Sequence, residues 1–173
     1  GLANYIVAHY APERRTIAIS RDSRLKSDTF AKTAARVFAA NGIHVYIYPY
    51  ISPVPTLSFA TRYLHCASGV MVTASHNPSK YNGYKVYGED GCQITTDAAD
   101  EILKDIEALD IFKDVKKISY DEGFKEGLIE YIKPEVITAF LAEVKKQSML
   151  SEKDPIDKNV AIVYSPLNGT GLV

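Results

Sequence analysis

The sequence has 173 residues, of which 46% are hydrophobic and 24% are charged, and its formal net charge is -1. This composition is typical of a globular chain with its own core, and it excludes collagen-like, low-complexity and intrinsically disordered proteins. The near-neutral charge argues against a surface built for nucleic acid or anionic lipid, so we expect no nucleic-acid partner and only a local anion site.

The first half of the chain alternates short apolar strands with amphipathic helices, which is typical of the α/β class. For the helix over 28–41, Ser27 is predicted to be the N-terminal cap and Gly42 the C-terminal stop. The strand over 69–73 is apolar, so we expect it to be buried on both faces. The other elements expected here are a helix over 1–10, strands over 16–20 and 43–48, and a helix over 56–65.

In the second half, Asn82-Gly83 is predicted to form a tight turn with positive backbone angles that sends a strand over 84–87 back antiparallel to its predecessor. An amphipathic helix is expected over 96–109. Pro134 begins another helix, whose apolar stripe we interpret as core. Weaker strands are expected over 115–120 and 128–132, a loop over 151–158, and a final strand over 159–164.

These elements predict an α/β fold in which a mixed sheet is sandwiched between helices, a three-layer α/β/α arrangement. We place residues 1–130 in one domain, and residues 131–173 in a linker helix and the truncated start of a second domain. A first helix without a capping residue, and a last strand that leads nowhere, indicate a piece of a longer protein. We therefore expect weak or no activity from this piece alone.

The cellular setting follows from the cysteines and from the lack of long apolar segments. Cys66 and Cys92 have neither zinc-ligand nor Cys-x-x-Cys spacing, which favours free thiols in a reducing compartment. No apolar stretch approaches the roughly 18 residues that a membrane-spanning helix needs. We expect a cytoplasmic protein with no membrane contact.

The most unusual segment, residues 72–85, begins at the end of the buried strand, at an edge where α/β sheets carry ligand sites. Small neighbours leave the Ser75 hydroxyl open, and Asn77-Pro78 stiffens the loop around it. The returning strand is expected to bring Lys85 close to Ser75. This arrangement would place an oxygen nucleophile beside a cation.

Two chemistries fit a hydroxyl in such a place. Acyl transfer would need a base, but the side chain of the adjacent His76 is expected to point away from Ser75, and there is no Gly-x-Ser-x-Gly elbow. Phosphoryl transfer needs a hydroxyl surrounded by cations, and Arg21, Arg24 and Lys85 join His76 in supplying them. The residues therefore favour phosphoryl transfer.

Residues 73–78 and 82–85 together resemble the phosphoserine loop of the α-D-phosphohexomutases, most closely of their phosphoglucomutase branch. The resemblance implies that Ser75 carries a phosphoryl group and exchanges it with a hexose phosphate substrate. The implied outcome is interconversion of glucose 1-phosphate and glucose 6-phosphate through glucose 1,6-bisphosphate. Further segments match the family in the same order: Asp22-Ser23-Arg24 with Ser27, Pro53-Val54-Pro55-Thr56 and Asn168-Gly169-Thr170-Gly171.

The resemblance also implies roles for individual residues. Ser75, Lys85 and His76 would be catalytic, and Mg²⁺ would bind through the phosphate on Ser75, with its remaining ligands outside this chain. Three further polar residues would bind substrate or phosphate: Arg24, Arg21 and Asn77.

Three alternatives stay open. Within the family these are phosphomannomutase and phosphopentomutase activity, and outside it a sugar-phosphate-binding module without catalysis. Residues 168–171 lack the lysine of a P-loop, so we interpret them as a structural turn rather than a phosphate cradle.

Overall fold

The computed structural model describes residues 1–150, 155, 157, 159–167 and 169–171. The strands are β1 (Thr16–Arg21), β2 (His44–Ile47), β3 (Ser68–Val72), β4 (Tyr84–Gly88) and β5 (Ile129–Tyr131). The helices are α1 (Leu2–His9), the short 3-10 helix η1 (Pro12–Arg14), α2 (Ser27–Ala40), α3 (Val54–Tyr63), α4 (Thr96–Ala108), α5 (Tyr120–Lys125) and α6 (Pro134–Lys146).

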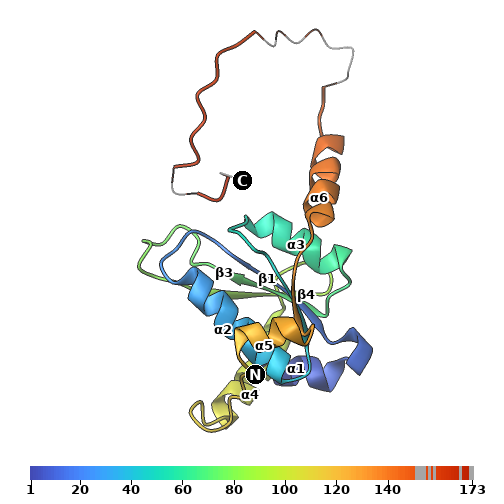
Figure 1. Ribbon diagram of the computed structural model, residues 1–173, viewed down its shortest axis with the longest axis vertical. Coiled ribbons are helices and arrows are strands. Elements are labelled where there is room, and N and C mark those ends of the chain that lie inside the picture. Colours follow the sequence, from blue (N-terminus) through green and yellow to red (C-terminus); the bar gives the residue numbers. More distant parts are fainter. Residues whose placement is uncertain (151–154, 156, 158, 168, 172–173) are drawn as a thin grey trace.

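The strands form one mixed sheet in the order β4-β3-β1-β2-β5. The pairs β1–β2, β1–β3 and β2–β5 are parallel, whereas β3 and β4 are antiparallel, as the sequence predicts. Helices α1, α2, α4 and α5 lie on one face of the sheet and α3 lies on the other (Figure 1). The predicted α/β class and three-layer arrangement are therefore confirmed.

Each central strand buries both of its faces. Ile17 and Ile19 of β1 pack in the core beneath α2, whereas Ala18 between them packs beneath α3. In β3, Val70 faces α2 and Met71 faces α3 in the same way, because successive side chains of a strand point to opposite faces. All of β3 is buried, which explains its continuous apolar sequence.

The predicted cap of α2 is wrong. Lys26, with a φ of 62°, is the N-cap residue, and Ser27 is the first residue of the helix. The Ser27 hydroxyl donates instead to Asp22 at 3.1 Å. A tertiary partner has therefore taken the side chain that local preference assigns to the cap. Gly42, with a φ of 73°, follows α2 as predicted.

The predicted strand over 115–120 is also wrong, because α5 begins at Tyr120. Ser119 caps this helix by accepting the backbone N–H of Glu122 at 3.1 Å. Ser-x-x-Glu is the sequence pattern of a capping box, so this helix start was visible in the sequence.

Gly83 is needed for a different reason from the one predicted. Neither Asn82 nor Gly83 is among the described residues with positive φ, which contradicts the expected turn geometry. A Cβ atom at Gly83 would lie 2.4 Å from the carbonyl oxygen of Thr73, so a side chain would collide with the opposite backbone. The Gly83 carbonyl accepts the Thr73 N–H at 3.1 Å, and the close approach thereby extends the β3–β4 pairing.

The helix α6 packs on α3, and the rings of Phe140 and Phe59 have centroids 5.6 Å apart. Val136 is buried, but Leu141 and Val144 are half exposed, so the stripe predicted as core is buried mainly at its start. Its remaining members, Ile137 and Phe140, are partly buried. The predicted domain boundary between residues 130 and 131 falls within β5 and remains a prediction.

The strand predicted over 159–164 is not formed. These residues have no regular secondary structure, and Ile162 and Val163 are largely exposed. A strand needs a neighbour for its N–H and C=O groups, and none of the described strands pairs with this segment. The loop predicted over 151–158 falls mostly outside the described residues.

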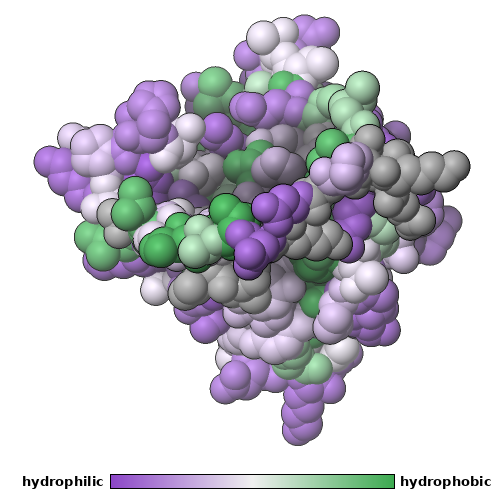
Figure 2. Space-filling view, turned by 90° about the horizontal axis from the view of Figure 1, so that it is seen from above, coloured by the Kyte–Doolittle hydropathy of each residue, from purple (hydrophilic) through white to green (hydrophobic). Residues whose placement is uncertain are grey.

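The surface mixes polar and apolar residues. Seen from the end at which α6 lies, hydrophilic residues cover much of the molecule, with smaller hydrophobic patches between them (Figure 2). Within the described part of the chain, no helix has the length and the apolar content that crossing a bilayer requires.

The two cysteines should react at different rates. Burial raises the pKa of the Cys66 thiol to about 12, whereas Cys92 is exposed. We expect iodoacetamide at about pH 8 to alkylate Cys92 in the folded protein and Cys66 only after unfolding, as measured by peptide mass spectrometry.

The same shift predicts a pH dependence of stability. Because the pKa of Cys66 is raised on folding, its contribution to stability is complete below about pH 9 and is lost as the pH rises towards 12. Fast alkylation of Cys66 in the folded protein would contradict both expectations.

Candidate functional site

Two loops leave the sheet side by side at the carboxyl ends of β1 and β3. Arg21 and Val72 are partners in the parallel register, and the Asp22 N–H donates to the Val72 carbonyl at 3.3 Å. Residues 22–26 and 73–83 therefore begin next to each other, at the edge of the sheet where α/β proteins bind ligands.

A cavity of about 760 Å³ lies between these loops and the segment around residue 170. Ser75 is exposed on its wall, so its hydroxyl is accessible. Most of the lining residues are polar, and one of them, Arg24, is a cation. The described lining residues are Asp22, Ser23, Arg24, Ser75, Asn77, Ser79, Leu167, Gly169 and Thr170.

The backbone of Ser75 is left-handed, with a φ of 55°. This conformation costs an L-residue about 1–2 kcal/mol, so the surrounding contacts must hold it. The Ser75 N–H donates to Oγ1 of Thr73 at 3.0 Å, and the Ser75 carbonyl accepts a hydrogen bond from the Arg24 guanidinium. The Asn77 N–H donates to the Ala74 carbonyl at 3.1 Å and closes a turn around Ser75.

The Asp22 carboxylate joins the two loops. Its Oδ2 accepts the Thr73 hydroxyl at 2.5 Å and lies 3.2 Å from Nε of Arg24. Its Oδ1 accepts the Arg24 backbone N–H at 3.0 Å and the Ser27 hydroxyl at 3.1 Å. The Ser27 hydroxyl in turn accepts the side-chain amide of Asn82 at 2.9 Å. One carboxylate thus connects both ends of the 73–83 loop to the 22–26 loop.

Arg24 binds the backbone of the Ser75 loop. Its Nη1 donates to the carbonyls of Pro78, at 2.8 Å, and Tyr81, at 3.2 Å, while Nη2 donates to the Ser75 carbonyl. Only 9% of the Arg24 side chain is exposed. The sequence predicts Arg24 as a phosphate ligand; in this structure it clamps the loop, and the phosphate role remains a prediction.

Of the six predicted site residues, the structure places Ser75, Arg24 and Asn77 on the cavity wall. His76 follows Ser75 in the loop and is exposed. Lys85 lies in β4 opposite Met71, so by strand alternation it is on the side of the sheet that faces α3. The structure therefore brings half of the predicted set to one cavity.

Arg21 points to a different part of the same sheet edge. Its guanidinium donates to the Tyr48 carbonyl at 3.1 Å and forms an ion pair with Asp28 at 2.9 Å. These contacts hold the loop after β2 against the start of α2. Arg21 is not among the described residues that line the Ser75 cavity.

Neither Asp22 nor Thr73 has a site role predicted from the sequence. The available signal was their position, since Asp22 lies just beyond the strand expected over 16–20 and Thr73 ends the strand expected over 69–73. In the structure they directly follow the neighbouring strands β1 and β3. Gly169 and Thr170 also line the cavity, although the sequence favours a structural turn there. The Gly169 N–H does donate to the Pro166 carbonyl at 2.8 Å, while Asn168 lies outside the described residues.

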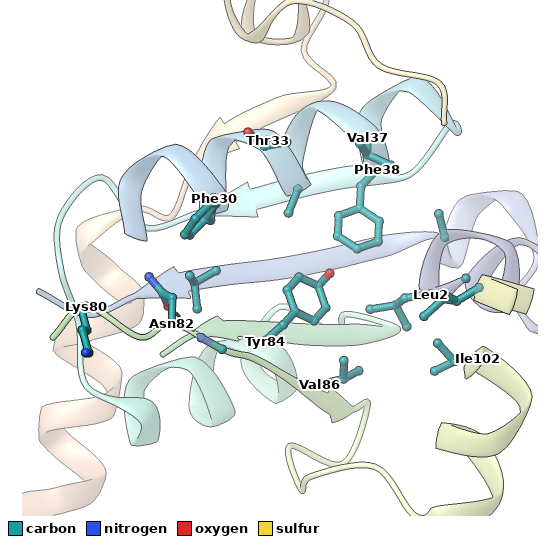
Figure 3. Close-up of a pocket in the computed structure, with 16 residues that line it drawn as sticks. Leu2, Phe30, Thr33, Val37, Phe38, Lys80, Asn82, Tyr84, Val86 and Ile102 are labelled. Atoms are coloured by element: carbon teal, nitrogen blue, oxygen red, sulfur yellow. Dashed lines mark hydrogen bonds between the residues drawn. The ribbon is translucent and has the colours of Figure 1, made fainter. Parts of the chain in front are cut away.

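A larger cavity, of about 810 Å³, lies between α2 and β4 (Figure 3). Phe30 and Phe38 of α2 point toward Tyr84 of β4 across it, and Leu2 lies at the end away from Lys80. This lining is mainly apolar and lacks the convergent donors that a phosphate group requires. Of these two cavities, the smaller one at Ser75 is therefore the better candidate for binding a phosphate group.

Comparisons with known proteins show which family this chain resembles. The family model for phosphoglucomutase/phosphomannomutase, alpha/beta/alpha domain I, matches residues 1–111. The chain is 34% identical over 172 residues to a phosphoglucomutase of Staphylococcus saprophyticus and 36% identical over 175 residues to one of Staphylococcus aureus. Both alignments cover 99% of this chain and 30% of the relative, so the chain spans about 30% of the length of these relatives.

Solved structures show the same fold. Parafusin, a phosphoglucomutase from Paramecium in its open form, matches 85% of this chain and 31% of its own, with a TM-score of 0.59 and 17% identity. A phosphoglucomutase/phosphomannomutase family protein from Burkholderia thailandensis matches 84% of this chain and 31% of its own, with a TM-score of 0.56 and 23% identity.

Replacing Arg24 with Lys should loosen the Ser75 loop, because an ammonium group lacks the planar fork that reaches several carbonyls at once. We expect amide hydrogen exchange over residues 75–83 to become about tenfold faster, with little change in β1. Lys80→Met is the matched control, since Lys80 lies on the same loop and its ammonium group lies over the Tyr81 ring rather than on the carbonyls that Arg24 binds. Equal exchange in Arg24→Lys and the parent would show that the clamp does not hold the loop.

Proposed function

Because the chain belongs to the phosphoglucomutase/phosphomannomutase family, we propose that Ser75 accepts and donates a phosphoryl group in a hexose phosphate mutase. The observation that carries this proposal is the exposed Ser75 hydroxyl, held in a left-handed turn on a polar cavity wall beside Arg24. Phosphoryl transfer depends mainly on positioning and charge stabilisation, which this loop is built to supply. The chain spans about 30% of its relatives, so the activity is proposed for a longer protein that contains it.

The reaction has two balanced transfers. In the first, the bond between phosphorus and Ser75 Oγ breaks, a bond to a free hydroxyl oxygen of the sugar phosphate forms, and the proton of that hydroxyl is passed to a base while Oγ is protonated. The product is glucose 1,6-bisphosphate. In the second, the bisphosphate has turned in the site, the bond between its other phosphorus and the sugar oxygen breaks, and a bond from that phosphorus to Ser75 Oγ forms. Ser75 Oγ gives its proton to a base while the sugar oxygen is protonated. The net result is exchange of phosphate between C1 and C6 of glucose.

The remaining predicted residues are given supporting roles in this transfer. His76, next to Ser75 in the loop, and Lys85, on the neighbouring strand β4, are assigned to proton transfer or charge stabilisation. Asn77, on the cavity wall, and Arg21, at the same edge of the sheet, are assigned to substrate or phosphate binding.

Mg²⁺, when bound, would neutralise charge on the transferred phosphoryl group. Asp22 is the carboxylate among the described lining residues, and donors from Thr73, Ser27 and Arg24 occupy both of its oxygens. The described part of the chain holds no group of three or more His, Cys, Asp or Glu residues that would bind a metal. The residues present therefore fit an ion that is held by the phosphate on Ser75 and by ligands from outside this chain.

Glucose phosphates are the proposed substrates because the two Staphylococcus relatives are phosphoglucomutases. Phosphomannomutase and phosphopentomutase activity are the alternatives within the family. A sugar-phosphate-binding module without transfer is the alternative of another class. A cytoplasmic location is proposed on the free thiols of Cys66 and Cys92.

Intact-mass measurement of the full-length protein tests the proposal. After incubation with glucose 1,6-bisphosphate we expect one phosphoryl group on Ser75, and we expect glucose 1-phosphate to remove it. Ser75→Ala should abolish both the phosphorylation and the mutase activity, whereas Ser148→Ala, just beyond α6, should change neither.

Two outcomes would count against the mutase. Full turnover by Ser75→Ala would remove Ser75 from the mechanism. Tight binding of the sugar phosphate without phosphorylation of the parent protein would favour the binding module.

A further inference from the structure

We infer that Thr73 is a positioning residue for phosphoryl transfer, whose hydroxyl fixes the backbone of Ser75 and thereby aims the Ser75 hydroxyl into the cavity. This inference rests on the proposed role of Ser75 as the phosphoryl carrier. Thr73 is 4% exposed and is not among the described lining residues of the cavity, so it acts through Ser75 rather than by touching substrate.

The need for such a residue comes from the Ser75 backbone. Its φ of 55° is a conformation that a non-glycine residue leaves readily unless neighbouring groups hold it. The Ser75 N–H is held by Thr73 Oγ1 at 3.0 Å, and the Ser75 carbonyl by Arg24. Both backbone polar groups of Ser75 are therefore held by other residues.

The direction of the Thr73 hydroxyl is set in turn by Asp22. A hydroxyl has one proton to donate and two lone pairs to accept with. Thr73 donates its proton to Asp22 Oδ2 at 2.5 Å, which leaves a lone pair for the Ser75 N–H. A carboxylate can only accept hydrogen bonds, so Asp22 fixes the direction of both bonds. We call this pair of hydrogen bonds, from the Ser75 N–H to Thr73 and from the Thr73 hydroxyl to Asp22, the relay.

The relay also controls the charge near the phosphoryl group. An unpaired carboxylate at the cavity wall would repel a phosphate. Here Asp22 accepts three hydrogen bonds and also lies 3.2 Å from Arg24 Nε, so its charge is largely compensated. The site therefore gains a rigid anchor with little cost to phosphate binding.

Loss of the relay should affect rate more than affinity. Without the Thr73 hydroxyl, Ser75 is free to return to a negative φ, which turns its Cβ and Oγ away from the position aligned for transfer. A misplacement of about 1 Å costs roughly 100-fold in rate, whereas the cavity walls that hold the sugar stay in place.

The test compares Thr73→Val, which keeps the shape and removes the hydroxyl, with Thr73→Ser, which keeps the hydroxyl, both in the full-length protein. We expect Thr73→Val to slow phosphorylation of Ser75 by glucose 1,6-bisphosphate about 10- to 100-fold in rapid-quench measurements, with KM for glucose 1-phosphate within about twofold of the parent. Thr73→Ser should restore most of the rate. A merely structural role would instead lower the unfolding temperature and leave the rate of the folded fraction unchanged.

The outcomes separate this inference from the proposed function. If the parent protein is never phosphorylated on Ser75, the proposed function fails. If the parent is phosphorylated and Thr73→Val reacts as fast, or if Thr73→Ser is as slow as Thr73→Val, the positioning role is overturned. Should Thr73→Val not fold, Asp22→Asn tests the relay from its other end, because one acceptor oxygen is replaced by an amide donor. Slower phosphorylation of Ser75 at unchanged KM then supports the positioning role, and an unchanged rate rejects it.

Discussion

A carboxylate that is mostly removed from water must have its oxygens occupied by donors, and Asp22 meets this requirement only while two loops stay together. It is 16% exposed and takes hydrogen bonds from its own loop, through Arg24, and from the Ser75 loop, through Thr73. Separating the loops would leave a partly buried charge without its partners. The position of Ser75 therefore depends on satisfying one anion that does not itself take part in the proposed transfer.

The sheet makes this contact possible before any loop residue is considered. Because β1 and β3 are parallel neighbours, Asp22 and Thr73 leave the sheet at the same edge. The antiparallel return of β4 then brings Gly83 against the Thr73 backbone, where any Cβ would collide. The strand order thus confines the Ser75 loop at both of its ends, and the side chains of Asp22 and Arg24 fix what lies between.

The sequence predicts features that depend on periodicity and on short motifs, such as the α/β class, the buried strand β3 and the exposed Ser75. It misses features decided by contacts outside the element itself, whether the partner lies in the preceding loop, as for Ser27, or in another strand. Ser27 is a good N-cap residue, but the cap preference is worth only about 1 kcal/mol, and Asp22 outcompetes it. The apolar residues 159–164 have the composition of a strand, yet strand formation needs a neighbour that the described chain does not provide.

Arg24 shows how one residue can serve structure and chemistry together. Carbonyls of the loop take up its N–H groups, which limits its use as a directional phosphate ligand in this conformation. Neutral carbonyls do not cancel the guanidinium charge, however. The Asp22 carboxylate beside Arg24 also accepts hydrogen bonds from Ser27 and Thr73, so its negative charge is not spent on Arg24 alone. A phosphoryl group on Ser75, at about -1.5 to -2 charge near neutral pH, would therefore still lie beside a fixed cation. The clamp would then stabilise the phosphorylated loop by its charge even while its hydrogen bonds hold the backbone.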